Sequence, residues 1–249
     1  MSRHAYNSEF MQYAAQSSAY AAETITTLIA REVQIESVLD VGCAQGTWLR
    51  AWSRRGVADY CGIDGDYVDR SRLEIPSANF TPIDLNKGFE LGRQFDLVQS
   101  LEVAEHLAPE SSGAIAESLA RHAKSYVLFS AAPPGQGGEF HINERPYEYW
   151  RGLFATQGFV AVDAIRPAVI QDQAISYWYR YNMFLFVRRT CLNRLSAPLL
   201  ARVEPDEREL SDLSPVSFRM RKAIVMRLPR RVQHQVARLK SKFLPTGRL

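Results

Sequence analysis

The sequence predicts an α/β fold, because apolar strand-like runs alternate with helical patterns over residues 37–189. Such alternation is typical of a mostly parallel sheet covered by helices on both faces. The segment around which the chain is organised is 38–47, an apolar run that ends in an acid and turns through small residues. A strand, a tight turn and a helix N-terminus in this order expose backbone N–H groups, which predicts a site for a polar ligand.

Seven segments have the apolar, β-branched or aromatic composition of strands. We expect these strands at 37–41, 59–63, 79–83, 95–100, 125–131, 158–165 and 181–188. Helices are expected over 48–52, 110–123 and 146–154, the last with a proline in its first turn. In open α/β sheets, ligands bind beyond the carboxyl ends of the strands. Functional residues are therefore expected directly after the strands.

Composition favours one main domain with appendages. The chain has 249 residues, 46% of them hydrophobic, which is enough for one substantial core. Its three cysteines suit a reducing compartment rather than a disulfide scaffold. No stretch reaches the ~18 apolar residues of a membrane span, and the first residues lack an apolar signal core. We therefore expect a cytoplasmic protein.

The chain divides into three expected parts: an N-terminal helical cap at 1–36, a ligand-binding domain at 37–190, and a linker with a basic tail at 191–249. In the first part, apolar residues recur at helical spacing and predict one or two helices. These residues are Phe10, Tyr13, Tyr20, Ile25, Leu28 and Ile29. The segment either caps the ligand pocket or packs on the edge of the sheet.

The last 59 residues carry 13 Lys/Arg against 5 Asp/Glu, although the whole chain has a net charge of only +3. Prolines and acids suggest a linker over about 196–215. From Arg219 onward there are ten Lys/Arg and no acid, and apolar residues recur every three or four positions until Pro229 interrupts the pattern. This predicts a pair of basic amphipathic helices in 216–249. They suit the inner, anionic face of a membrane, nucleic-acid phosphates, the domain itself or a second subunit in a homodimer. Nucleic acid is the least favoured partner, because no recognised binding fold accompanies the charge.

The turn after the first strand reads Asp-Val-Gly-Cys-Ala-Gln-Gly at residues 40–46. A dinucleotide fingerprint requires G-x-G-x-x-G. Here the register is Gly42, Ala44 and Gly46, and Thr47 occupies the position of the last glycine. No Gly-Lys-Ser/Thr follows, which excludes a phosphate loop. Asp40 would repel a pyrophosphate but suits a ligand that bears an ammonium group. A nicotinamide-dependent oxidoreductase is therefore disfavoured.

This Asp-x-Gly-x-x-x-Gly motif resembles the first motif of the class I S-adenosylmethionine-dependent methyltransferases. The resemblance covers about residues 37–189 and implies a Rossmann-like sheet of seven strands, the last one antiparallel. It implies that S-adenosylmethionine lies against the turn. The cofactor contacts expected there are Asp40, Gly42, Cys43, Ala44, Gln45 and Gly46.

Acids also follow the second and third strands. Asp64 lies 18 residues after Gly46, close to the spacing at which an acid reaches ribose hydroxyls. In the resembled family, an acid at the position of Asp84 accepts from the adenine amino group, and the backbone N–H of the next residue, here Leu85, meets a ring nitrogen. The alternative is that Asp64 caps a helix and that Asp84 belongs to an ordinary turn. The remaining expected cofactor contacts are Gly65, Ser100 and Leu101.

Ionisable residues gather after the fourth strand. Glu102, Glu105 and His106 fall within five residues, and one helical turn separates the two glutamates, so that their carboxylates could converge. His141 lies on the long Pro- and Gly-rich loop after the fifth strand and is expected to face them. Long loops in compact domains are usually functional or disordered.

Two hypotheses follow for this cluster. In the first, Glu102, Glu105, His106 and His141 bind a divalent cation, for which Zn²⁺, Mn²⁺ or Fe²⁺ suits the donors better than Mg²⁺. The metal would activate an acceptor hydroxyl. The arrangement looks like that of the metal-dependent small-RNA 2′-O-methyltransferases, and its first three groups recur in ubiquinone-pathway O-methyltransferases. In the second, His106 or His141 is a general base without metal. A third reading gives these groups only structural roles.

The expected function is therefore S-adenosylmethionine-dependent methylation, with Glu105, His106 and His141 as the catalytic residues. The ionisable cluster favours O-methylation of a hydroxyl. The Pro-Pro-Gly-Gln-Gly-Gly loop looks similar to loops of methyltransferases from bacterial surface-glycan and secondary-metabolite pathways, so a saccharide or other small molecule is the expected acceptor. The aromatic segment 175–181 either receives a sugar or ring or closes the sheet edge. The competing class is a non-catalytic methyltransferase-like module that its basic tail recruits to a membrane or partner.

Overall fold

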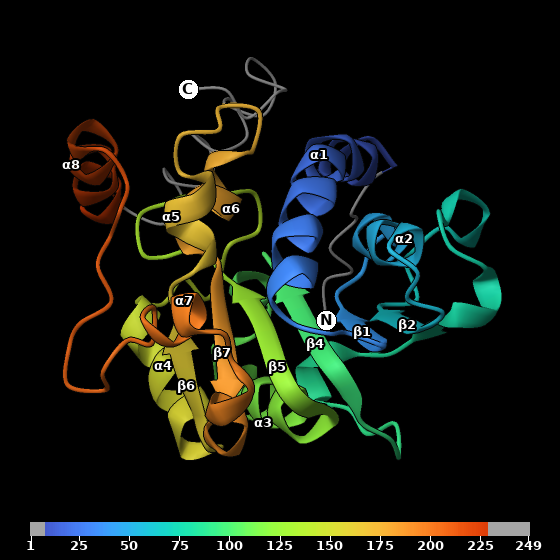
Figure 1. The fold of residues 1–249 in the computed structure, drawn as a ribbon. Helices are drawn as coiled ribbons and strands as arrows, with labels where there is room; N and C mark the ends of the chain where they lie inside the picture. The colour runs from blue at the N-terminus through green and yellow to red at the C-terminus, as the bar shows by residue number, and fades with distance from the viewer. Residues whose placement is uncertain (1–7, 229–249) are drawn as a thin grey trace.

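The computed structural model describes residues 8–228, with side chains from Ser18 onward (Figure 1). Its centre is a seven-stranded sheet in the order β3-β2-β1-β4-β5-β7-β6. The strands are β1 Ser37–Val41, β2 Asp59–Asp64, β3 Phe80–Pro82, β4 Phe95–Leu101, β5 Ala123–Ser130, β6 Phe159–Val162 and β7 Phe184–Arg188. Only β7 runs against its neighbours, pairing antiparallel with both β5 and β6. The predicted fold class is confirmed.

Three strands are shorter than the sequence suggests, and the first of them is the segment 79–83, which gives only β3 Phe80–Pro82. The segment 158–165 gives only β6, because the chain turns at Asp163 into the short helix α5 Ile165–Val169. A buried two-bond ion pair between Asp163 and Arg166, with N···O distances of 2.8 and 2.7 Å, fixes this turn. The segment 181–188 loses its first residues to the helix α6 Tyr177–Asn182.

Helices cover both faces of the sheet. One core holds α1 Ser8–Glu32 and α2 Thr47–Arg54 with one face of the strands, and the other core holds α3 Ser112–His122 and α4 Tyr147–Thr156 with the opposite face. Alternate residues of a strand point to opposite faces, and accordingly Val38 belongs to the first core and Leu39 to the second. Two further helices toward the C-terminus are α7 Ala197–Leu200 and α8 Val216–Met226.

The N-terminal helix α1 contacts two separate parts of the domain. It buries Ala21, Ile25 and Ile29 in the core that also holds α2. Further toward its N-terminus, the Ser18 hydroxyl lies 2.8 Å from that of Tyr179, and Tyr20 donates to Asp172 at 3.0 Å. The helix therefore bridges α2 and the segment that contains α5 and α6, as Figure 1 shows.

Residues 196–215, expected to form a linker, pack on the domain. The guanidinium of Arg151 on α4 donates to three carbonyl groups of this segment, those of Pro205, Asp206 and Arg208. Val203 pairs with Val162 of β6 as an isolated β-bridge. Residues 229–249, which contain the second half of the predicted helix pair, lie outside the described residues. Within residues 8–228, no helix has the length and apolar character required to span a bilayer.

Candidate active site

The glycine turn after β1 has a backbone that few other residues could adopt. Gly42 and Gly46 have φ of +81° and +84°, in the left-handed region that favours glycine. A Cβ atom on Gly42 would lie 2.3 Å from Cγ2 of Val103, and one on Gly46 would lie 2.8 Å from Cγ1 of Ile75. The turn therefore requires glycine for its conformation and for its contacts. Val103 belongs to the turn that carries Glu105, so the two predicted parts of the site are in contact.

Asp64, at the end of β2, holds the glycine turn in place. Its Oδ2 accepts from the backbone N–H of Ala44 at 2.8 Å, and its Oδ1 accepts from the backbone N–H of Gly65 at 2.7 Å and from the hydroxyl of Tyr67. Burial raises the pKa of Asp64, and these hydrogen bonds oppose that rise. The ring of Tyr67 lies over Gly65, where a Cβ atom would approach it to 2.2 Å.

Asp40 lies in the middle of the sheet, with β2 on one side and β4 on the other. Its Oδ2 accepts no hydrogen bond within the described part of the chain. Burial, helped by the nearby carboxylate of Asp64, raises the pKa of Asp40 to about 7, although the Gln99 amide lowers it in part. The buried hydroxyl of Ser100, at the same end of β4, likewise has no partner among residues 8–228. Most buried polar atoms in proteins are hydrogen-bonded, so these atoms mark where a polar ligand would bind.

The other expected cofactor residues vary in their surroundings. Cys43, Gln45, Leu85 and Leu101 are buried. Burial raises the pKa of the Cys43 thiol well above its ordinary value, which favours the protonated thiol. Asp84 is exposed and accepts from the side-chain amide and the backbone N–H of Asn86, at 3.3 and 3.2 Å. The slight burial of Asp84 raises its pKa, but these hydrogen bonds outweigh it and lower the pKa overall. Its carboxylate thus caps a local turn, and the adenine contact stays a prediction.

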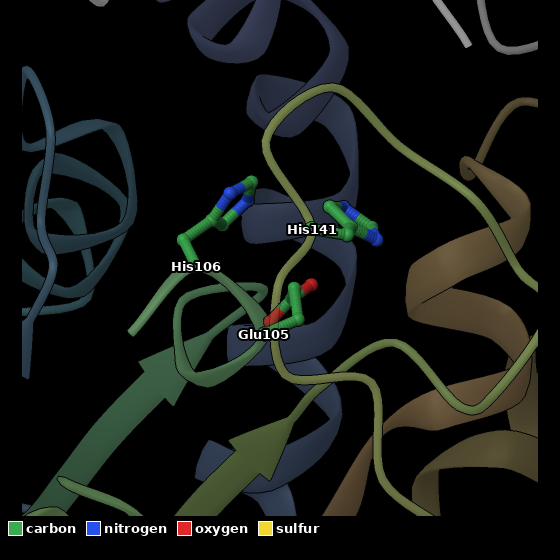
Figure 2. A group of neighbouring side chains, drawn as sticks. All are labelled: Glu105, His106 and His141. Atoms are coloured by element: carbon green, nitrogen blue, oxygen red, sulfur yellow. The ribbon is translucent and has the colours of Figure 1, made fainter. Parts of the chain in front are cut away.

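Glu105, His106 and His141 come together beyond the carboxyl ends of β4 and β5 (Figure 2). The three can each offer one ligand atom such that all three atoms lie within 4.8 Å of one another. The two imidazole rings meet edge to face, with centroids 4.8 Å apart. Glu105 and His106 belong to the short turn η4 Ala104–His106, whereas His141 lies on the loop between β5 and α4.

A buried carboxyl group, that of Glu105, and a half-buried one, that of Glu102, lie at the base of this cluster. The oxygens of Glu105 accept no hydrogen bond of good geometry within residues 8–228, although the backbone N–H groups of Glu105 and Ala132 and the carboxyl group of Glu102 lie close to them. Burial, and next the neighbouring Glu102, raise the pKa of Glu105 well above its ordinary value, which backbone groups of Glu105 and Ala132 offset only in part. The Glu102 carboxylate accepts from the amides of Gln136 at 3.2 Å and Asn182 at 3.4 Å. Burial raises its pKa too. Glu102, expected as a fourth metal ligand, is thus not in the three-residue group.

The loop that carries His141 is held by a single carboxylate. Glu144 accepts at 2.8 Å from the backbone N–H groups of Gly135 and Gly137 and lies 2.8 Å from Nδ1 of His141. The ring of His141 packs against Gly138, where any Cβ atom would lie 2.1 Å from Nε2. These contacts give the imidazole one orientation.

A second residue joins this loop to the turn that carries Glu105. The backbone N–H of Asn143 donates to the Glu105 carbonyl at 3.0 Å, and its side chain donates to the carbonyl of Ala104 at 3.2 Å. Sequence reasoning missed Gln136, Glu144 and Asn182. Only Glu144 could have been found from the local sequence. An acid three residues after a histidine in a glycine-rich loop can accept hydrogen bonds from the imidazole and from the backbone N–H groups of the loop.

The aromatic segment 175–181 is mostly interior. Tyr177, Tyr179 and Tyr181 are buried. Tyr179 meets Trp48 of α2 edge to face at 5.3 Å, while Tyr177 packs on Phe218 of α8 at 5.0 Å. These rings connect α1, α2 and α8 rather than forming an open plate for a sugar.

Comparison with known proteins identifies the family. Residues 11–164 match a family model described as a methyltransferase domain. The chain belongs to this family. No curated protein matches its sequence. The methyltransferase fold seen here is shared with several solved structures, all of them distant in sequence.

Three of these structures illustrate the likeness. An O-methyltransferase family protein from Burkholderia thailandensis matches with a TM-score of 0.54 and 14% identity, over 72% of this chain and 58% of that one. The sugar N-methyltransferase KedS8 from Streptoalloteichus sp. matches with a TM-score of 0.51 and 17% identity, over 71% of this chain and 88% of that one. Human N-acetylserotonin methyltransferase matches with a TM-score of 0.50 and 14% identity, over 72% of this chain and 55% of that one. The chain thus spans little more than half the length of two of them, and 51% of Streptomyces venezuelae DesVI.

Proposed function

We propose that this methyltransferase domain uses S-adenosylmethionine to methylate a hydroxyl group of a saccharide or other small molecule. The observation that carries the proposal is a pair of buried acids, each with at least one carboxylate oxygen that accepts no hydrogen bond in the described chain: Oδ2 of Asp40 and both oxygens of Glu105. Asp40 lies on β1 just before the glycine turn, and Glu105 lies on the turn after β4; the two turns touch where Val103 meets Gly42. Asp40 suits a cationic cofactor and Glu105 suits an acceptor group, so the two ligands would bind at adjoining positions.

The residues present fit the cofactor. Oδ2 of Asp40 would accept from the ammonium group of S-adenosylmethionine, and that positive charge would favour the ionised form of Asp40. The backbone of the turn from Gly42 to Gly46 would lie against the ligand, which leaves no room for side chains there. Asp64 would accept from the ribose hydroxyls in place of the hydroxyl of Tyr67. When bound, the cofactor supplies an electrophilic methyl carbon attached to a positively charged sulfur.

The histidine pair would activate the acceptor. With Nδ1–H donating to the Glu144 carboxylate, His141 keeps Nε2 as the atom that can accept a proton. This nitrogen would take the proton of the acceptor hydroxyl, and the bound cofactor would supply the methyl group that the hydroxyl oxygen receives. His106, beside it, would orient the acceptor. General bases of this kind typically contribute 10²–10⁴-fold to a rate.

A metal is the second candidate for acceptor activation, because two imidazoles and the unpartnered carboxylate of Glu105 are a donor set that suits Zn²⁺, Mn²⁺ or Fe²⁺. Donor atoms at about 2.0–2.1 Å from a tetrahedral zinc lie about 3.3 Å apart. The donor atoms here lie within 4.8 Å of one another. Small side-chain rotations would thus have to accompany binding.

Calorimetric titration of S-adenosylmethionine into the protein, with and without a chelator, tests both proposals. We expect binding at micromolar strength that the chelator leaves unchanged. His141→Ala should abolish methyl transfer to a panel of hydroxylated acceptors while cofactor affinity stays within about twofold. Loss of transfer on chelation, restored by added Zn²⁺ or Mn²⁺, would assign activation to a metal. Absence of cofactor binding would instead favour the non-catalytic module.

A further inference from the structure

The helix α8 presents an apolar face that no described residue covers. Val216, Met220 and Ile224 are 62%, 62% and 60% exposed. Their spacing of four residues aligns them on one side of the helix. We call these three residues the α8 stripe. Arg227, which is exposed, lies on the same side of the helix, and the exposed Arg219 lies at the border of that side.

The opposite face of α8 is fixed to the domain. Phe218 is buried against Tyr177 and Tyr181, with ring centroids 5.0 and 5.8 Å away. Lys222 is buried and forms an ion pair with Asp212. The helix would have to break both the contacts of Phe218 and the ion pair of the buried Lys222 before it could rotate and bury the α8 stripe.

The helix also contacts the loop that carries His141. Arg221 donates to the backbone carbonyl of Gln136 at 3.0 Å. Gly135 is so close to α8 that a Cβ atom there would lie 2.3 Å from the carbonyl oxygen of Lys222. In Figure 1, α8 stands beside α5 and α6, beyond the carboxyl ends of the strands. A surface that binds α8 would therefore lie next to the candidate active site.

We propose that α8 docks on an anionic lipid bilayer through the α8 stripe. The charge of the chain favours this occupant over a second copy of the chain. Residues 216–249 contain ten Lys/Arg and no acid. Two copies of such a segment would repel each other, whereas an anionic surface attracts both the helix and the residues after it. An apolar stripe flanked by arginines is typical of helices that lie in the plane of a membrane interface.

The test is flotation of the full-length protein with phosphatidylcholine vesicles, with and without phosphatidylglycerol. We expect binding only to the anionic vesicles, and release at high salt. The double variant Met220→Glu, Ile224→Glu should lower the bound fraction about tenfold or more, since it replaces apolar side chains that enter the interface by acids. Leu200→Glu is the matched control, because Leu200 is an exposed leucine on α7, at 44%, outside the stripe. It should bind as the unaltered protein does.

Cofactor titration and thermal unfolding of each variant keep this test separate from the proposed function. Both should match the unaltered protein, because the substituted side chains are exposed. The proposal fails if the unaltered protein does not float with anionic vesicles, or if the double variant floats as well as the control. It also fails if light scattering detects a dimer that the double variant dissociates, which would assign the α8 stripe to a second copy of the chain.

Discussion

Asp40 should make the stability of the cofactor-free protein fall as the pH rises. Its pKa is about 7 in the folded protein, against an ordinary value of 3.8, chiefly because the carboxyl group is buried. Below about pH 4 the group is protonated in both the folded and the unfolded chain, so it has no effect there. Between about pH 4 and 7 the unfolded chain ionises but the folded one does not, and stability declines. Above about pH 7 the whole penalty applies.

The size of this penalty follows from the difference in pKa. One pKa unit corresponds to about 1.36 kcal/mol, so a difference of about three gives at most about 4 kcal/mol. Asp40→Asn cannot ionise, and the variant should lack this dependence. Near pH 4 the two proteins should unfold at similar temperatures. Near pH 8 the variant should unfold roughly 10 °C higher, at about 2–4 °C per kcal/mol for a chain of this size.

The ionisation of Asp40 should also govern cofactor affinity, but in the opposite direction: affinity should rise with pH, whereas stability falls. An ammonium ligand requires ionised Asp40, so binding should weaken as the pH falls below about 7 and be about tenfold weaker near pH 6 than at high pH. Asp40→Asn should weaken binding about 10–100-fold near pH 8, the value of a hydrogen bond to a charged group. Binding near pH 7 should also release about half a proton, since the ligand lowers the pKa of Asp40.

The assays are thermal unfolding between about pH 4 and 8 and calorimetric titration in buffers of different ionisation enthalpy. Asp69→Asn is the control, because Asp69 is exposed and its pKa is lowered by hydrogen bonds to Ser71. It should leave both pH profiles unchanged above about pH 5. Parallel unfolding curves for the unaltered protein and Asp40→Asn across this range would refute the reasoning.

Three further predictions concern the site and its support. Glu144→Gln should lower the rate of methyl transfer about 10–100-fold by weakening the orientation of His141, with cofactor affinity unchanged by calorimetry. Gly42→Ala should abolish cofactor binding, because its Cβ atom would lie 2.3 Å from Cγ2 of Val103. Adding Val103→Ala should restore binding in part. If it restores none, the positive φ of residue 42 alone accounts for the loss of binding. Arg151→Met should lower the free energy of unfolding by about 2–4 kcal/mol in urea, because three carbonyl groups lose a charged donor. The control is Arg54→Met, which removes an exposed side chain paired with Glu23. It should change the free energy of unfolding by less than about 1 kcal/mol.

The sequence predicted the centre of the sheet better than its antiparallel edge. Strands that are covered on both faces are continuous apolar runs, and their ends are marked by glycine or acids, as at Asp40 and Asp64. Near the edge, Ile165 and Tyr181 are just as apolar but belong to short helices. An apolar run of this length does not distinguish a strand from a buried helical turn.

The site was predictable where topology determines it. Parallel strands end at one edge of the sheet, which explains why the positions of Asp40, Asp64 and Glu105 along the chain were enough to group them. Asp84 follows the same rule, but its carboxylate accepts from Asn86, two residues away, and local capping of this kind competes with ligand binding. The contact between Asn182 and Glu102 joins residues 80 positions apart, and no pattern along the chain encodes it.

The buried acids also bear on whether the fold is catalytic. An ionisable group in the interior with no hydrogen-bond partner is costly, and the cost lowers the stability of the cofactor-free protein. Asp40 and Glu105 are both buried and both have a carboxylate oxygen without a partner among the described residues, and Asn or Gln would fill nearly the same volume without a charge. A module that serves only as a scaffold would gain stability from those replacements. The acids are understandable if ligands at the glycine turn and at the histidine pair supply the missing partners, so their burial favours an enzyme over a binding module.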